Sequence, residues 1–486
     1  MLSCPLESAN KGGGRLFGCL LPSRADPHHS RAEQGVTPCG KSLQRVLGSI
    51  SRVLAVAGLL ASSHANSNAL PGSELPALVE RTLASHPGIR VQQSLARAAD
   101  AQVDAARRQF FPNPSISFER VETSERDSVY RGNDQITVAR LQQSLWTGGR
   151  LRGGLARARS SQALARAEID ALRLQLALQV AGLWAEAHAA QAVADAYLQS
   201  RDVHERLRAM VERRVAGGAS AEADAELARA RLQQVEADLA GAIARRDAAL
   251  ERIRTVTKVT DFAPGTELVG RYRTAFTPTD PDFLVASAIE NSPFVERARL
   301  QVELSQADVR VARAALSPEI FLRAESQRGS FEANDETTRN RLVLGVTSTL
   351  GPGLSVLAGV DEARARLEAA QEEVATEEMN TTEQVRSDLV LLNSAQARQE
   401  LLALSRRSAD AVLGSSERLF VAGRRPWQDI MNAARDVAQA DAQAAEAAGT
   451  DLVAGWRLAL VVQGLTSVLA NTSSLPAENQ NSRESP

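Results

Sequence analysis

The sequence has 486 residues and a formal net charge of -2, and only 4% of its residues are aromatic. A near-neutral chain has no overall attraction to nucleic acid, and so few large rings argue against several compact globular domains. Its Ala-, Arg-, Glu-, Gln- and Leu-rich composition predicts long helices packed closely side by side. The cysteines are Cys4, Cys19 and Cys39, so the body of the chain has neither a disulfide nor a thiolate metal site.

The region from residue 41 to residue 65 is typical of a secretory signal peptide. Basic residues precede a short apolar run at 53–60, and small residues follow at 63–65, as in the cleavage site that signal peptidase recognises. The run is too short to span a bilayer, and the alternative is the start of a buried helix. We interpret residues 1–40 as an extension from a mis-assigned start codon. The segment before Cys19 resembles a lipoprotein box without the apolar run that should precede it.

An internal repeat organises the rest of the chain. Several motifs recur at an offset of 206: His86-Pro87 with Ser292-Pro293, Phe111-Pro112 with Ser317-Pro318, Val215-Ala216-Gly217 with Val421-Ala422-Gly423, and Arg229 with Arg435. A constant offset over so long a stretch indicates a duplication. We therefore expect a first repeat at 70–254, a linker at 255–280, a second repeat at 281–465 and a disordered polar tail at 471–486.

Each repeat predicts a helix followed by a β-hairpin. Proline suits a first helical turn, so helices are expected at 88–111 and 294–317. Polar and apolar residues then alternate on both sides of a polar loop, which predicts hairpins at 115–146 and 319–350.

Long helical rods are predicted after the hairpins. About 65 residues without a breaker correspond to a helix of about 100 Å. The expected spans are 150–214 and 354–420, followed by glycine-containing turns and return helices at 221–254 and 427–462. Arg and Glu recur throughout these helices, so they must stand in water, and a ring of such helical hairpins would enclose a channel.

The four predicted strands have about the length that a tilted strand needs to cross a bilayer. Four strands cannot close a barrel, and open sheet edges are not tolerated in lipid. If the strands cross a membrane, several chains must therefore share one barrel. The alternative is that the hairpins cap a soluble helical bundle.

Residues 70–465 resemble the TolC family of outer-membrane efflux and type I secretion proteins through this order of elements, present twice. The most specific stretch is Leu419-Phe420-Val421-Ala422-Gly423-Arg424-Arg425-Pro426-Trp427-Gln428-Asp429-Ile430-Met431-Asn432, which is similar to a family segment at the periplasmic tip. The resemblance implies a mainly α fold with a small β part. It also implies a homotrimer whose twelve strands form a barrel in outer-membrane lipid above an α-helical periplasmic tunnel.

The resemblance implies a duct without catalysis, so we expect no enzyme, no cofactor, no bound metal and no nucleic-acid partner. The segment around Arg424 and Trp427 looks closest to members that export large toxins or adhesins. Type I secretion with an inner-membrane ABC exporter and a periplasmic adaptor is thus the expected role. Multidrug efflux with another pump is the alternative, and a periplasmic coiled-coil adaptor is a third interpretation. His188 and His204 are expected to be solvated or packed, not metal-binding.

The resemblance also implies a gate at the periplasmic turns. Arg425 matches the family's basic gate residue, Asp429 its first acidic residue at the entrance, and Asp224 an acidic partner on the first turn. Phe420 stands where many relatives have Tyr, and Asn432 stands where a second Asp often sits. The contacts that close the gate are therefore expected to be weaker than in those relatives or to differ from theirs. The alternative is that Arg425 and Asp429 are ordinary helix-start residues.

The family docks its adaptor at the same turns, which makes Gly217, Gly218, Gly423, Arg424 and Trp427 candidate adaptor contacts. The glycines permit tight turns, and the additional Gly218 leaves the alignment of the first turn open by one residue. An exposed Trp427 would be a candidate hot spot, whereas a tryptophan packed between helices is equally ordinary.

Overall fold

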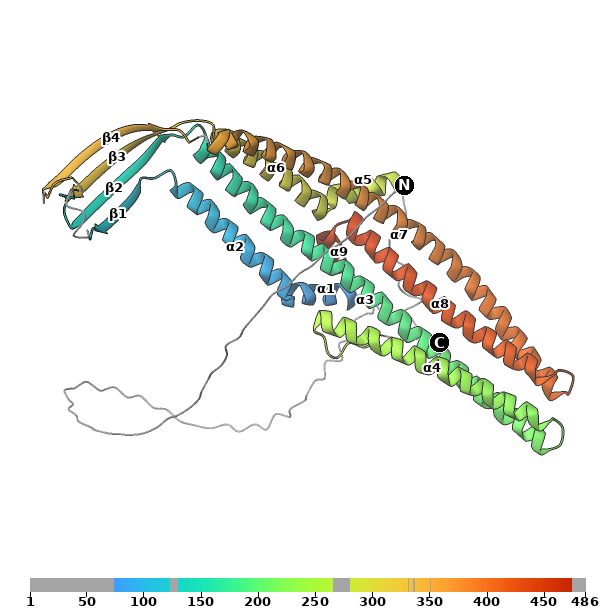
Figure 1. Cartoon of the computed structure of the whole chain (residues 1–486). Coiled ribbons are helices and arrows are strands. Elements are labelled where there is room, and N and C mark those ends of the chain that lie inside the picture. The colour runs from blue at the N-terminus through green and yellow to red at the C-terminus, as the bar shows by residue number, and fades with distance from the viewer. Residues whose placement is uncertain are drawn as a thin grey trace, which may run out of the picture. The chain divides into compact units, whose positions relative to one another are not determined.

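Figure 1 shows the computed structural model of the chain, which describes residues 74–122, 130–264, 280–330, 332–334, 337–349 and 351–473. All of them belong to one compact unit, Ser67–Pro486. The expected extension at 1–40, the expected signal peptide at 41–65 and the expected tail beyond residue 473 lie outside the described residues. These interpretations stay predictions.

Helices predominate among the described residues. In chain order the elements are α1 (Glu74–Ser85), α2 (Pro87–Arg108), β1 (Asn113–Arg120), β2 (Gln135–Trp146), α3 (Arg150–Ala216), α4 (Glu222–Thr257), α5 (Pro281–Asn291), α6 (Pro293–Ala314), β3 (Glu319–Arg328), β4 (Thr338–Thr347), the short 3-10 helix η3 (Pro352–Leu354), α7 (Ser355–Val421), α8 (Trp427–Val462) and α9 (Leu465–Ser473). The predicted fold class, mainly α with two β-hairpins, is confirmed.

The two halves of the chain contain the same elements at matching lengths. α2 and α6 have 22 residues each, α3 and α7 have 67, and α4 and α8 have 36. α2 and α6 start 206 residues apart, at Pro87 and Pro293, whereas α3 and α7 start 205 residues apart, at Arg150 and Ser355. The constant offset of 206 is therefore wrong beyond the hairpins, because the hairpin region is one residue shorter in the second half.

The helix before each hairpin begins at a capped proline. His86 accepts a hydrogen bond from the Gly88 N–H, and Ser292 accepts one from the Val295 N–H. The prolines occupy the first helical position, where no N–H is needed. Both helices end three residues before the predicted ends, because the last residues tighten into turns with i to i+3 hydrogen bonds.

The strands form one antiparallel sheet in the order β1-β2-β3-β4. The pairs β1–β2 and β3–β4 are the two predicted hairpins, and the pairing of β2 with β3 joins the two halves of the chain (Figure 1). A bulge between Ser144 and Trp146 shifts the register of β2 next to the helices. β1 and β4 form the edges of the sheet.

The long helices and the return helices pack along one another away from the sheet. α3 contacts α2, α4, α6 and α8, while α7 contacts α5, α6 and α8 (Figure 1). At 67 residues, α3 and α7 are each about 100 Å long. Small residues let these helices approach closely, as where Gly449 of α8 meets Ala189 of α3.

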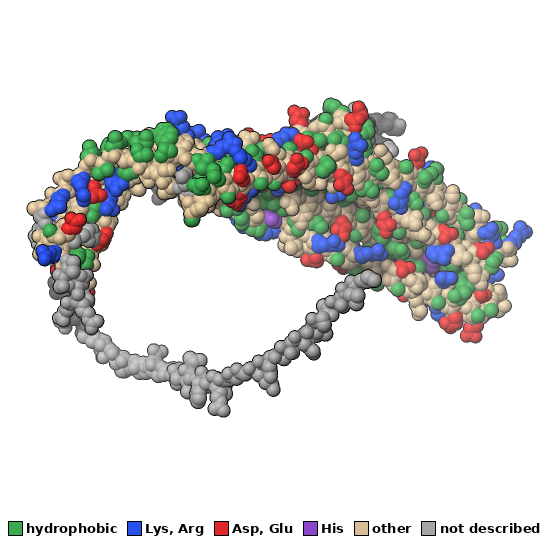
Figure 2. All heavy atoms as spheres, turned by 45° about the horizontal axis from the view of Figure 1, so that its top comes forward, with side chains coloured by type: hydrophobic (Ala, Val, Ile, Leu, Met, Phe, Trp, Pro, Cys, Tyr) green, Lys and Arg blue, Asp and Glu red, His purple; other side chains and the backbone are tan. Residues whose placement is uncertain are grey.

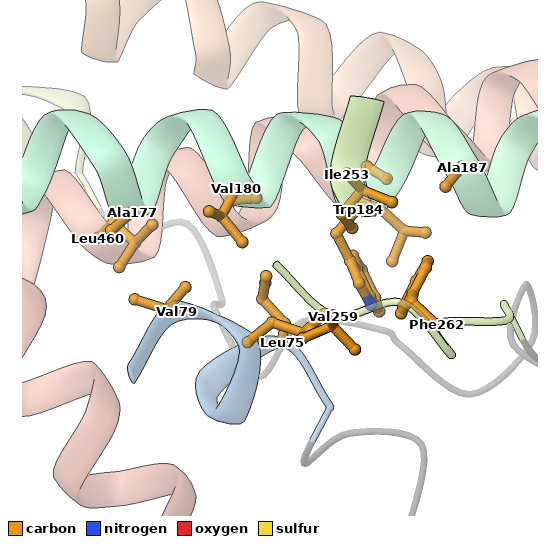
Figure 3. Packing of buried hydrophobic residues seen from close by; sticks show 14 of the residues in the cluster. Leu75, Val79, Ala177, Val180, Trp184, Ala187, Ile253, Val259, Phe262 and Leu460 are labelled. Atoms are coloured by element: carbon orange, nitrogen blue, oxygen red, sulfur yellow. The ribbon is translucent and has the colours of Figure 1, made fainter. Parts of the chain in front are cut away.

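The main hydrophobic core lies where α1, α3, α8 and the segment after α4 meet. Trp184 is fully buried in it, and Leu75, Val259 and Phe262 lie around its ring (Figure 3). α1 was not predicted, although it supplies Leu75 to this core. Its counterpart α5 was also missed, because each helix is too short to show a clear period in the sequence.

α9 corrects the predicted start of the tail. It runs to Ser473, so the first residues of the segment expected to be disordered are helical. At the other predicted boundary, α4 continues to Thr257 and the segment expected to be a linker from residue 255 begins inside a helix.

Candidate functional site

The two turns that join the long helices to the return helices have the same geometry. They comprise residues 217–221 and 422–426. Gly218 and Gly423 have φ angles of 70° and 72°, a left-handed conformation that favours glycine, whereas Gly217 has a φ of -85°. Gly218, and not Gly217, is therefore the counterpart of Gly423, which resolves the alignment that the sequence left open.

The same alignment makes Asp224 and Asp429 equivalent, since each is the third residue of its helix. A carboxylate in a first turn is favoured by the partial positive charge at the helix N-terminus. The Asp224 N–H donates to the carbonyl of Ala221, and the Asp429 N–H donates to that of Pro426. Asp224 is half-buried beside its turn, and the side chain of Asp429 is 45% exposed.

Arg425 is anchored to α7 more firmly than to Asp429. Its Nη1 donates to the hydroxyl oxygen of Ser416 at 3.0 Å, and Ser416 is fully buried. Its Nε lies 3.9 Å from Oδ2 of Asp429, and both side chains are partly exposed, so this ion pair contributes little. Ser416 was missed by the sequence analysis, since nothing in the local pattern marks it as a partner of Arg425.

Another arginine joins the end of α3 to the end of α7, next to the two turns. Arg214, in the last turn of α3, donates from Nη1 to the backbone oxygen of Phe420 at 2.6 Å. Its guanidinium carbon also lies 4.5 Å from the centre of the Phe420 ring, within the range of a cation–π contact. A tyrosine hydroxyl is therefore not needed to link the ends of α3 and α7. The sequence offered no signal for Arg214, which is one of several arginines near the end of α3.

A hydrophobic cluster beneath the turns packs the ends of four helices together. Its buried members are Leu207, Val211, Ala228, Leu413, Phe420, Trp427, Ile430, Met431, Ala433 and Ala434. Trp427 is only 4% exposed, so the idea of an exposed tryptophan as an adaptor hot spot is wrong, and the packed alternative holds. Gly217, Gly218, Gly423 and Arg424 are exposed at the turns, and Asn432 is exposed on α8.

The two histidines of α3 are packed inside the helical part. Nδ1 of His188 lies 2.8 Å from the Trp184 carbonyl, and Nδ1 of His204 lies 2.8 Å from that of Ser200. Burial lowers the pKa of both rings, and the hydrogen bond to the carbonyl offsets part of that shift. Across the described part of the chain, no three potential metal ligands of the His, Cys, Asp or Glu type come together.

The sheet has one apolar face and one polar face, because side chains alternate along each strand. Following the register, the apolar face carries Ile116, Phe118, Leu141, Leu342, Leu344 and Val346, which are 48% to 80% exposed. Figure 2 shows hydrophobic side chains gathered over the strands. The opposite face carries polar and charged side chains, with a few buried apolar ones such as Val138. So large an exposed apolar surface marks a contact with lipid or protein.

None of the described helices combines the length and the apolar character that a membrane-spanning helix needs. The profile of the outer membrane efflux protein family matches residues 78–257 and 284–461. The chain belongs to the outer membrane efflux protein family.

The family assignment confirms the predicted resemblance and the predicted location in the outer membrane. The two matched stretches begin at residues 78 and 284, which differ by 206, so the profile matches both repeats. No curated protein sequence matches the chain significantly.

Solved structures show the same fold at low sequence identity. VceC from Vibrio cholerae is 17% identical, with a TM-score of 0.67 over 81% of this chain and 96% of that one. The CmeC outer membrane channel of Campylobacter jejuni is 14% identical, with a TM-score of 0.68 over 82% and 89%. The MtrE outer membrane channel of Neisseria gonorrhoeae is 18% identical, with a TM-score of 0.62 over 80% and 89%.

Proposed function

We propose that three copies of this efflux-family chain form an outer-membrane export channel. The observation that carries the proposal is a sheet with two edges, β1 and β4, and a highly exposed apolar face. Edge strands cannot be left open in lipid, whereas β1 of one copy can pair with β4 of the next. Three chains then supply twelve strands, more than the eight of the smallest membrane barrels. The helices continue this barrel as a periplasmic duct, and conduction requires no catalysis.

Exposed apolar side chains on α7 support the association of several copies. Met379, Val390, Leu401 and Val412 are 50% to 67% exposed and follow one another every eleven residues. Eleven residues are close to three helical turns, so these side chains form a stripe along the helix. In an isolated chain this stripe would face water, and a neighbouring copy would cover it.

The cargo and the partners distinguish two forms of this function. The segment from Arg424 to Trp427 supports type I secretion of a large toxin or adhesin, with an inner-membrane ABC exporter and a periplasmic adaptor. The description of the family as efflux proteins supports the other form, small-molecule efflux with another pump. Deleting the gene separates the two forms: loss of one large protein from the culture medium supports secretion, and increased sensitivity to drugs supports efflux.

Fractionation and conductance test the channel itself. The protein is expected in the outer-membrane fraction as a trimer that dissociates on heating, and it should conduct ions in planar bilayers. A soluble periplasmic pool without conductance would instead support the adaptor or scaffold interpretation.

The gate has a separate test. Arg425→Ala combined with Asp429→Ala should raise single-channel conductance if these side chains restrict the entrance. Arg424→Ala is the matched control, because it removes an exposed arginine from the same turn. Equal conductance of the double variant and the wild type would remove Arg425 and Asp429 from the gate.

A further inference from the structure

One row of polar side chains crosses the whole sheet on its polar face. The register aligns Ser115, Arg140, Glu325 and Arg341 as neighbours on β1, β2, β3 and β4. Glu325 accepts a hydrogen bond from Arg140 at 2.8 Å and pairs with Arg341 at 3.1 Å. The Glu325 side chain is only 12% exposed, while those of Arg140 and Arg341 are 44% and 57% exposed. Two arginines therefore share one carboxylate, and the row presents positive charge to solvent.

A third arginine stands in the next row of the same face. Arg323 lies two residues before Glu325 on β3, with its guanidinium carbon 4.8 Å from the centre of the Phe321 ring. Its Nε has no hydrogen-bond partner among the described residues. The Phe321 ring in turn lies over Gly345 of β4, where any Cβ would clash with it. Packing thus holds Arg323 in place, and its charge adds to that of the row.

The remaining charges of this face do not cancel the excess. By the alternation of the strands, Arg339, Glu119 and Glu319 also lie on it. Glu319 pairs with Arg150 of α3 at 2.9 Å. In the net charge of this face, Arg339 and Glu119 cancel. The excess of positive charge around Glu325 therefore remains.

We propose that this row, together with Arg323, forms a positively charged ring inside the barrel that favours anionic over cationic solutes. The inference rests on the proposed trimeric channel, in which the apolar face contacts lipid and the polar face lines the lumen. Each chain would bring three arginines, Arg140, Arg323 and Arg341, against the single Glu325. Rings of basic side chains are a known physical means by which pores select anions.

The size of the barrel decides whether such a ring acts on a passing ion. Twelve strands about 4.8 Å apart, tilted by about 40°, give a backbone radius of about 12 Å. Arginine side chains reach several ångströms inward from this wall, so the axis lies within about one Debye length of the charges at physiological salt, roughly 8 Å. At 1 M salt the Debye length is about 3 Å, and the preference should largely disappear.

The permeability ratio of chloride to potassium, measured in planar bilayers under a KCl gradient, tests the ring. Arg323→Gln leaves both ion pairs of Glu325 intact and is expected to lower this ratio about twofold at about 0.1 M salt. The triple variant with Arg140→Gln and Arg341→Gln should lower it further. Glu325→Gln is the matched control, because it removes the opposite charge from the same row and should raise the ratio.

Each outcome bears on one of the two proposals. If channels form and both Arg323→Gln and Glu325→Gln keep the wild-type ratio, the ring proposal is overturned while the channel stands. If the wild-type protein forms no channels, the proposed function itself fails. Should the triple variant not assemble, opposite shifts in the two single variants still support the ring.

Discussion

The close contact between α3 and α8 allows a sharp test of the helical packing. Gly449 of α8 faces α3 so closely that a Cβ built there would lie 2.6 Å from the Cβ of Ala189. This separation is well below van der Waals contact, and neither carbon belongs to a flexible side chain. Gly449→Ala therefore requires the two helices to move apart.

The magnitude follows from two opposing terms. Replacing glycine by alanine inside a helix stabilises it by about 1 kcal/mol. Overpacking a tight contact costs about 1–3 kcal/mol. Gly449→Ala is thus expected to be neutral to destabilising, by up to about 2 kcal/mol. Gly182→Ala is the matched control at the same helix pair, because its Cβ would lie 4.0 Å from Val453. That variant should gain up to about 1 kcal/mol.

The assay is the thermal loss of helical circular dichroism of the purified protein, recorded at one scan rate for all variants. Gly449→Ala should melt below Gly182→Ala. The double variant Ala189→Gly/Gly449→Ala moves the Cβ from one helix to the other, so it should recover the wild-type midpoint. If Gly449→Ala melts above the wild type by as much as Gly182→Ala does, α3 and α8 do not pack as described.

Three further predictions concern polar groups in the helical part. Arg214→Ala removes one of the two donors to the Phe420 carbonyl and leaves only the Gly423 N–H, so amide hydrogen exchange at both turns should accelerate, with a loss of about 1 kcal/mol. Arg214→Lys should recover part of the protection, and unchanged exchange would refute the link. His188 has a lowered pKa in the folded state, so protonation opposes folding, and stability should fall as the pH drops from about 7.5 to about 5.5. His188→Phe should make this dependence shallower, with His204 retaining its own part of it, and an equally steep dependence would contradict the reasoning. Burial raises the pKa of Asp388, although the hydrogen bond from Gln384 and the charge of Arg457 offset part of this shift. The folded protein therefore holds the proton of Asp388 more tightly than the unfolded chain does, and its stability should decline as the pH rises above the ordinary pKa of an aspartate. At about pH 7, Asp388→Asn should then raise the free energy of unfolding by about 1 kcal/mol and raise the melting midpoint. A lower midpoint would show that the ion pair with Arg457 outweighs the cost of burial.

The order and length of the main elements were predictable from the sequence. Pro87 and Pro293 mark helix starts through their own backbone geometry, and the glycines near residues 218 and 423 mark turns for the same local reason. The alternation in the hairpins and the uninterrupted rods are likewise local patterns. The short helices α1 and α5 were missed, because their place depends on the cores that they cover.

The tertiary structure decided which side chains meet. Trp427 and Arg425 are two residues apart in one motif, yet Trp427 is buried and Arg425 is partly exposed. Arg214 meets Phe420 across 206 residues, and Arg140 meets Glu325 across 185. The period of a helix or strand assigns a residue to a face, but the partner on that face comes from another segment of the chain. For this protein, the sequence alone therefore determined the duplicated plan of helices and hairpins. The contacts that would hold the turns, and those that would place charges in the proposed lumen, depended on how the two repeats of the chain pack together.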